Sequence, residues 1–262
     1  MHQLVIVGGG RMGEALLGGL LAAGRAPADL AVVEPVAGRQ RALEERFPGV
    51  IVNDGPLEAE GVVLAVKPSH AAAAASAAGQ AGCRRLLSIA AGVSTATLEA
   101  ALPAGTPVVR AMPNTPALVG AGAAAVAGGR AATEEDLGWA EEVLGAVGVV
   151  VRVAEPLLDA VTGLSGSGPA YVFLVAEALI DAGVLVGLPR DVASTLAVQT
   201  LLGSARLLAE GAEGPEALRA AVTSPGGTTA AGLAVLEDRA VRAAFLAAVR
   251  AATERSQALG RA

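Results

Sequence analysis

The sequence predicts an α/β doubly wound domain followed by an all-α C-terminal domain. In the first part of the chain, short apolar runs alternate with helix-like segments. This alternation is typical of right-handed crossovers and a mostly parallel sheet. After about Glu155 the β-branched runs stop, and one helical segment follows another. We therefore place one domain at residues 1–156 and a second, helical domain at residues 157–262.

The elements of the first domain follow from the apolar periodicity. The predicted strands are 4–7, 30–33, 50–52, 62–66, 86–89, 108–111, 123–126 and 147–153. The predicted helices are 12–23, 39–47, 70–78, 95–102 and 134–144. Thr133 is the expected N-cap of the last of these helices, because its hydroxyl can accept a bond from the first turn.

The second domain consists of predicted helices only, at 169–186, 190–210, 215–222, 229–237 and 241–259. Pro169, Pro189 and Pro215 stand where a proline begins a helix at low cost. The most apolar stretch, residues 171–188, contains Glu177 and Asp181. These charges favour a helix buried between subunits or inside a core over a membrane span.

Composition and charge exclude several classes of partner. The chain of 262 residues is 53% hydrophobic and has a formal net charge of −6. No stretch accumulates basic residues, so we expect neither nucleic acid nor a membrane as a partner. Cys83 is the only cysteine, which fits a reducing compartment. The first residues lack the basic region and cleavage site of a signal peptide, and we expect a cytoplasmic protein.

A glycine-rich motif follows the first strand and opens the first helix. It has the form G-x-G-x-x-G, with Gly8, Gly10 and Gly13 as its glycines. In a Rossmann domain the first glycine permits a tight turn, the second lets the backbone approach a pyrophosphate, and the third lets helix and strand pack closely. The helix N-terminus then offers N–H groups to the phosphates. The sequence therefore predicts a nicotinamide dinucleotide, NADPH or NADH, held by Gly8, Gly9, Gly10, Arg11, Met12 and Gly13.

An acidic residue, Glu34, closes the second strand about 20 residues beyond the glycine motif. Its carboxylate can accept hydrogen bonds from the adenosine ribose and would repel a 2′-phosphate, which favours NAD. Arg39 and Arg41 follow closely and can offset that repulsion. The choice between the two cofactors therefore stays open.

Further residues at the carboxyl ends of strands would border the same crevice. Ala65-Val66-Lys67-Pro68 ends one strand, and Lys67 is the only lysine of the chain. Ala91, Pro113 and Asn114 follow two later strands and would lie near the nicotinamide.

Two clusters of Gly, Ser and Thr precede helices of the second domain, at residues 164–171 and 222–229. Hydroxyls and free N–H groups at a helix N-terminus favour an anion. Each cluster taken singly is also consistent with an ordinary helix cap. Together, behind a dinucleotide domain, they favour a binding site for a carboxylate substrate.

Strong general acids and bases are scarce. The two histidines are His2, which is terminal, and His70, which stands at a helix start. No spacing typical of metal ligands or of a Ser-His-Asp arrangement occurs, so we expect no metal. Hydride transfer to an already protonated imine suits such a chain, because the cofactor supplies the difficult step and the protein supplies the positions.

The motifs occur in one order along the whole chain: Gly8–Gly13, Ala65–Pro68, Arg110–Pro116, Leu164–Tyr171 and Val222–Thr229. In this order the sequence resembles the pyrroline-5-carboxylate reductases. The resemblance implies reduction of 1-pyrroline-5-carboxylate to L-proline, the last step of proline biosynthesis, with NADPH or NADH. It also implies that the helical domain serves dimerisation, that the active site lies between the cofactor of one subunit and the helical domain of its mate, and that dimers can form rings.

The resemblance also assigns residues. The substrate carboxylate would be held by Ser224, Gly226, Gly227, Thr228 and Thr229. Thr229 would lie near the ring nitrogen as a hydrogen-bond partner or proton donor, and Ser224 and Thr229 are the catalytic candidates. The cofactor would contact Gly8, Gly10, Met12, Gly13, Ala65, Lys67 and Pro68, with Asn53 on its adenosine side.

Two other functions stay open on the sequence. Another two-domain reductase, for β-hydroxyacids or imines, would share the architecture. Such enzymes usually carry a catalytic lysine, tyrosine or aspartate in the helical domain, where this chain has no lysine and one tyrosine, Tyr171. A non-catalytic NAD-sensing protein would keep the glycine motif without needing the cluster at 223–229.

Overall fold

The computed structural model describes residues 2–260. The chain divides into two compact units. The first contains the residues up to Ser167 together with those from Arg250 onward, and the second is Gly168–Val249. The boundary predicted from the sequence lies earlier, between residues 156 and 157, and it does not foresee the return of the chain end to the first unit.

The first unit is built on one sheet of eight strands in the order β3-β2-β1-β4-β5-β6-β7-β8. The strands are β1 His2–Val7, β2 Leu30–Val33, β3 Ile51–Asn53, β4 Ala59–Leu64, β5 Arg85–Ser88, β6 Val108–Met112, β7 Gly122–Gly128 and β8 Gly148–Arg152. Six of them run parallel, as the alternating pattern predicts. The chain direction reverses between β6 and β7, because the short link at Thr115–Val119 leaves no room for a crossover helix.

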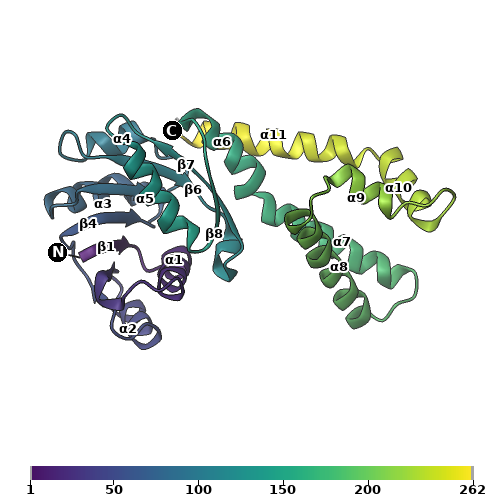
Figure 1. Ribbon diagram of the computed structural model, residues 1–262, viewed down its shortest axis with the longest axis horizontal. Coiled ribbons are helices and arrows are strands. Elements are labelled where there is room, and N and C mark those ends of the chain that lie inside the picture. The colour runs from purple at the N-terminus through teal and green to yellow at the C-terminus, as the bar shows by residue number, and fades with distance from the viewer. Residues whose placement is uncertain (1, 261–262) are drawn as a thin grey trace. The chain divides into compact units, whose positions relative to one another are not determined.

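Helices cover both faces of this sheet (Figure 1). They are α1 Arg11–Ala22, α2 Ala37–Arg46, α3 Pro68–Gln80, α4 Thr95–Ala100 and α5 Glu134–Gly145. Leu4 and Ile6 of β1 point to the face that α1 and α5 cover, and Val5 points to the face that α3 and α4 cover. Alternate residues of one strand thus feed two separate cores, which confirms the doubly wound domain.

The link to the second unit begins with a short turn at Glu155–Leu157 and helix α6 Leu158–Val161. It continues through a π-helical turn at Thr162–Gly166 into α7 Gly168–Leu185. A side chain at Gly166 would press on the methyl group of Met112 in β6. Close packing therefore explains a glycine of the 164–171 cluster.

The second unit contains α7, α8 Arg190–Glu210, α9 Pro215–Ala221, α10 Thr228–Asp238 and the first part of α11 Val241–Gly260. Few of its side chains are buried, and large apolar ones lie in solvent, such as Phe173 (61% exposed) and Leu246 (72% exposed). The apolar stretch at 171–188 therefore does not lie in a core of the single chain. By length and composition alone, residues 155–185 and 190–210 would suffice to cross a membrane.

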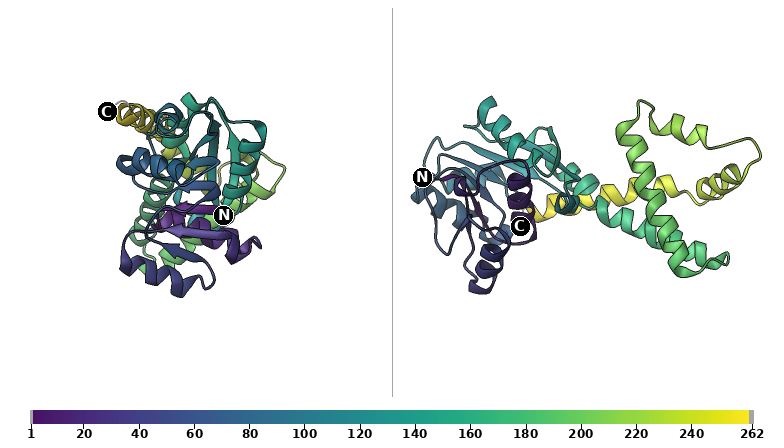
Figure 2. Two further views of the ribbon diagram at one scale, coloured as in Figure 1. Left: turned by 90° about the vertical axis from the view of Figure 1, so that its left-hand side faces the viewer. Right: turned by 60° about the horizontal axis from the view of Figure 1, so that its bottom comes forward.

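The C-terminal end of α11 belongs to the first unit (Figure 2). There the Ser256 hydroxyl donates a hydrogen bond of 2.6 Å to Asp159 of α6. Ser256 is buried by this contact with a segment 97 residues away in sequence. The segment that leaves the first unit and the segment that returns to it are thus tied to one another.

Candidate active site

The glycine loop lies where β1 and β4 part and the strand order reverses. Gly8 has a φ of +108°, and a Cβ there would stand 2.5 Å from the carbonyl oxygen of Ala65. A Cβ at Gly13 would overlap the carbonyl oxygen of Gly8. Both positions therefore require glycine for the close approach of loop, strand and helix.

Gly10 differs from these two glycines, because a Cβ there would meet no atom of the protein within 4 Å. It is the N-cap of α1 and has no side chain to cap the helix. The first N–H groups of α1 therefore face open space beside a residue without a side chain. This is the shape and polarity that a pyrophosphate needs.

Glu34 directly follows β2 beside this loop and is only 8% exposed. One carboxylate oxygen accepts a hydrogen bond of 3.0 Å from the Gly9 N–H, and the other accepts one of 2.9 Å from the Val36 N–H. Arg39 donates to the Gly9 carbonyl at 2.5 Å and is paired with Glu14. Glu34 thus fixes the glycine loop, while Arg39 shares the Glu14 carboxylate with Arg46.

The other predicted cofactor residues lie at the same edge of the sheet, at the ends of β3, β4 and β6. Asn53 donates a bond of 3.1 Å to the Gly55 carbonyl. Lys67 is exposed as the N-cap of α3, and Pro68 is the first residue of that helix. Asn114 is buried, accepts a bond of 2.8 Å from the Ala123 N–H and donates one of 3.1 Å to the Ser165 carbonyl. Its amide therefore joins β7 and the π-helical turn.

A crevice of about 600 Å³ opens in the first unit beyond the ends of β4 and β5. Pro68 and Ala91, both predicted from the sequence, line it together with Gly92. Arg255 and Gly260 of α11 line its other side. Sequence motifs gave no sign of these two residues, because only the return of α11 brings them there.

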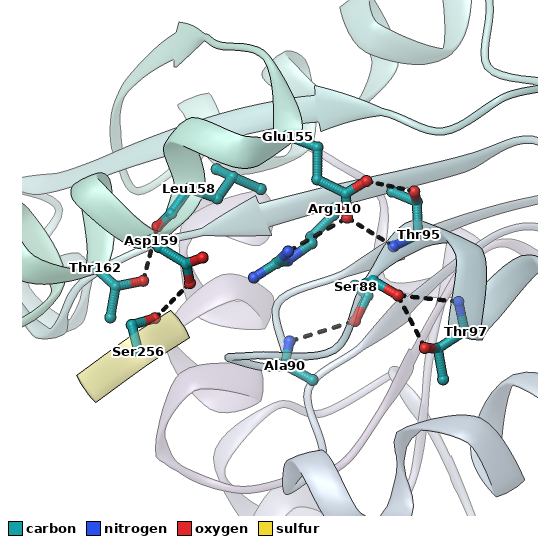
Figure 3. A network of polar contacts seen from close by, with 11 residues as sticks. Ser88, Ala90, Thr95, Thr97, Arg110, Glu155, Leu158, Asp159, Thr162 and Ser256 are labelled. Atoms are coloured by element: carbon teal, nitrogen blue, oxygen red, sulfur yellow. Dashed lines mark hydrogen bonds and ion pairs between the residues drawn. The ribbon is translucent and has the colours of Figure 1, made fainter. Parts of the chain in front are cut away.

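Beside the crevice lies a polar network that joins segments far apart in the sequence (Figure 3). Glu155 accepts bonds of 2.7 Å and 2.6 Å from the N–H and hydroxyl of Thr95, and its carboxylate is 3.3 Å from the guanidinium of Arg110. Burial opposes the charge of Glu155, but the bonds from Thr95 and the Arg110 cation outweigh it and lower the pKa of this carboxyl. Glu155 therefore stays ionised at neutral pH.

The predicted substrate residues lie together in the second unit, in the turn before α10 (residues 223–229), of which Thr228 and Thr229 already form the first turn of the helix. Gly226 has a φ of +69°, and the Gly227 N–H donates a bond of 3.0 Å to the Ser224 carbonyl. Gly227 is the N-cap of α10 and offers no side chain. Among the described residues, the hydroxyls of Ser224, Thr228 and Thr229 have no hydrogen-bond partner, and all three side chains are exposed. This turn therefore presents hydroxyls and helix N–H groups to whatever binds there.

Comparison with known proteins covers both units. A family model described as pyrroline-5-carboxylate reductase dimerisation matches residues 155–259. A second model, described as NADP oxidoreductase coenzyme F420-dependent, matches residues 3–92. The pyrroline-5-carboxylate reductase of Mycobacterium tuberculosis is 47% identical, over 99% of this chain and 97% of its own length.

The chain belongs to the pyrroline-5-carboxylate reductase family.

Solved structures of the pyrroline-5-carboxylate reductase family share the whole fold. The enzyme of Coxiella burnetii is 35% identical, with a TM-score of 0.94 over 98% of each chain. The Plasmodium falciparum enzyme, solved with NADP bound, is 30% identical, with a TM-score of 0.83 over 99% of this chain and 98% of the other. The family relationship confirms the resemblance found from the motifs.

Proposed function

We infer that the protein reduces 1-pyrroline-5-carboxylate to L-proline with NADPH or NADH. This inference rests on the chemistry of the turn before α10, taken together with the family to which the chain belongs. The hydroxyls of Ser224, Thr228 and Thr229 have no partner among residues 2–260, and the turn offers a helix N-terminus but no charged side chain of its own. Such a turn suits a small carboxylate, since main-chain N–H groups and hydroxyls can bind an anion without a cation.

The first unit holds the dinucleotide. The N–H groups at the start of α1 bind its pyrophosphate, and the absent side chain of Gly10 leaves the space for it. Ala65, Val66, Lys67 and Pro68 border the path from the glycine loop to the crevice, and Ala91 and Pro113 stand further along the same edge.

Bound reduced nicotinamide supplies the hydride for the C=N carbon of the substrate. The ring nitrogen carries the proton that balances the reaction, so that an iminium becomes a secondary amine. Ser224, Gly226, Gly227 and Thr228 hold the carboxylate and fix the direction of the ring. The Thr229 hydroxyl bonds to the ring nitrogen and orients it for transfer.

We propose that Glu34 gives the site a preference for NADH. Its buried carboxylate lies at the end of β2, where a Rossmann domain receives the adenosine ribose. Arg39 already donates to the Gly9 carbonyl and to the Glu14 carboxylate, which it shares with Arg46, so a 2′-phosphate would compete with both contacts.

We also propose that the functional unit is a cytoplasmic homodimer, with rings of dimers as its larger assembly and with no nucleic acid or membrane as partner. The exposed apolar side chains of α7 and α8 supply the contact surface of residues 157–262. In the dimer, the turn before α10 of one subunit faces the cofactor of the other.

The experiment that tests this function follows the absorbance of reduced nicotinamide after purified protein is mixed with pyrroline-5-carboxylate. Turnover with NADH or NADPH, and proline as product, are expected. If the absorbance falls with neither NADH nor NADPH, the result would contradict the proposed function. Turnover of a β-hydroxyacid in its place would assign the protein to another branch of two-domain reductases.

A further inference from the structure

The loop between β5 and α4, residues 89–94, borders the crevice and is fastened at both ends. At its start the Ala90 N–H donates a bond of 3.3 Å to the hydroxyl of Ser88, which is fully buried in the sheet. At its end Thr95 begins α4. Between these points Ala91, Gly92 and Val93 line the crevice. The position of this loop therefore sets the shape of the crevice wall.

Glu155 fastens the far end of this loop from a segment 60 residues away in sequence. Both of its carboxylate oxygens bond to Thr95, at 2.7 Å to the N–H and 2.6 Å to the hydroxyl. Thr95 is only 6% exposed, so loss of these bonds would leave buried polar groups without water to replace them, which costs free energy. The dashed lines of Figure 3 show this double contact.

The same carboxylate also reaches the neighbouring strand. Arg110 of β6 is 8% exposed, and its guanidinium donates to Glu155 at 3.3 Å. Two residues later β6 ends at Met112, and Pro113 and Asn114 follow at the sheet edge. The partly buried carboxylate of Glu155 thus connects the start of α4, which follows β5, with β6, the next strand of the sheet.

We propose that Glu155 is a positioning residue for hydride transfer, which holds the loop at residues 89–94 against the reactive end of the dinucleotide. The proposal rests on the proposed function. A dinucleotide laid along the strand ends places its nicotinamide beyond the glycine loop, toward this crevice. Because hydride transfer is sensitive to shifts of about 1 Å, a loosened crevice wall slows the transfer itself.

The test compares Glu155→Gln and Thr95→Val with the wild type and with Thr95→Ser. Glu155→Gln removes the anion, Thr95→Val removes only the hydroxyl bond at nearly constant volume, and Thr95→Ser keeps that bond. Glu134→Gln is the matched control, because Glu134 is 85% exposed and pairs with Arg152 on the surface. The measurements are the single-turnover rate of hydride transfer, its isotope effect with deuterium at the transferred position, the cofactor Kd and the Tm.

We expect Glu155→Gln to slow the single-turnover transfer about tenfold or more, with a cofactor Kd within about twofold of the wild type. Thr95→Val should be slowed less, Thr95→Ser should restore the rate, and Glu134→Gln should leave it unchanged. The isotope effect on kcat should rise in the slow variants, because transfer becomes more rate-limiting. If Glu155→Gln does not fold, Thr95→Val and Thr95→Ser carry the same comparison.

A transfer rate within about twofold of the wild type in both Glu155→Gln and Thr95→Val, with a lower Tm, would overturn the positioning role and leave a structural one. A rate loss matched by an equal loss of cofactor affinity would overturn it too. Wild-type protein is assayed first with pyrroline-5-carboxylate. Failure of that assay counts against the proposed function, whereas equal rates in an active series count against Glu155 alone.

Discussion

The two units of this chain differ in how many of their apolar side chains they bury within themselves. In the first, both faces of the sheet are closed by helices, and side chains such as Leu4, Ile6 and Val62 are fully buried. In the second, α9 and α10 bury no residue, and α7 and α8 bury only Pro169, Ala193 and Ala197. The first unit has a closed hydrophobic core of its own, whereas the second needs another surface to cover its apolar side chains.

The same contrast holds for the two halves of the site. At the glycine loop, Gly8 lies against Ala65 beyond β4, Gly13 lies against Gly8 and Ile6 of β1, and Glu34 binds the Gly9 N–H. In the turn before α10, the hydroxyls of Ser224 and Thr229 have no partner within the part of the chain that is described. We therefore propose that the cofactor half is preformed within one subunit and that assembly completes the substrate half.

The largest effect should come from a charge on the exposed apolar face of the second unit. Phe173→Glu places a carboxylate where the proposed dimer buries a ring that is 61% exposed in the single chain. The cost of at least about 3 kcal/mol per subunit should dissociate the dimer and reduce turnover to background. Light scattering after size exclusion checks the mass, with Phe173→Leu as the control. A Phe173→Glu variant that remains a fully active dimer would show that this face is not the interface.

Gly10→Ala should weaken cofactor binding without destabilising the fold. The added methyl group meets no protein atom within 4 Å and lies where the pyrophosphate approaches. We expect a Kd for NADH about thirtyfold higher, or about 2 kcal/mol of binding free energy. Fluorescence titration measures it, and a Tm close to that of the wild type shows that the fold is intact. Gly138→Ala, an equally open glycine in α5, should bind as the wild type does. Unchanged affinity in Gly10→Ala would place the pyrophosphate elsewhere.

Thr229→Ala should lower kcat/KM for pyrroline-5-carboxylate about tenfold, because one hydrogen bond to the ring nitrogen is worth about 1.5 kcal/mol. The cofactor Kd should not change, since Thr229 belongs to the second unit. Steady-state kinetics with both substrates separate the two effects. Thr229→Ser, which keeps the hydroxyl, should recover most of the activity. If kcat/KM stays at the wild-type value in Thr229→Ala, that hydroxyl has no part in the site.

The smallest effect should be the change of cofactor preference in Glu34→Gln. The amide oxygen can still accept from the Gly9 N–H, which the carboxylate binds at 3.0 Å, but the amide carries no charge and its NH2 group cannot accept from the Val36 N–H. Relief of a charge repulsion worth about 1 kcal/mol should improve NADPH use relative to NADH about fivefold. The ratio of the two kcat/KM values is the readout, and Glu34→Ser should move it in the same direction. A constant ratio in both variants would mean that Glu34 does not face the ribose.

Local periodicity and turn chemistry made much of the first unit predictable. The strand–glycine–helix motif placed Gly8 and Gly13, and both turn out to be positions where a Cβ would strike backbone. The antiparallel direction of β7 was not predictable in the same way, because an apolar run does not reveal how its strand pairs. The pairing of Glu155 with Thr95 joins residues 60 positions apart, so no local pattern contains it.

The second unit shows the opposite limit. Its helices were predictable from proline starts and apolar runs, and the turn at residues 223–229 from its hydroxyls. The sequence does not predict where those helices are buried, because apolar periodicity does not distinguish a core from an interface. The sequence predicts that the helix at residues 171–188 is buried either in a core or between subunits. Its side chains are largely uncovered in the single chain, so burial between subunits is the alternative that stays open.

The most direct measurement of the central claim mixes two defective proteins. Gly10→Ala lacks a good cofactor half and Thr229→Ala lacks a good substrate half, and the two are unfolded, combined and refolded together. If each site takes its cofactor half from one subunit and its substrate half from the mate, every mixed dimer regains one intact site. With NADH and substrate both well below their wild-type KM values, random pairing then restores about a quarter of the wild-type activity. Activity no higher than the average of the two separate variants would contradict a site that is shared between subunits.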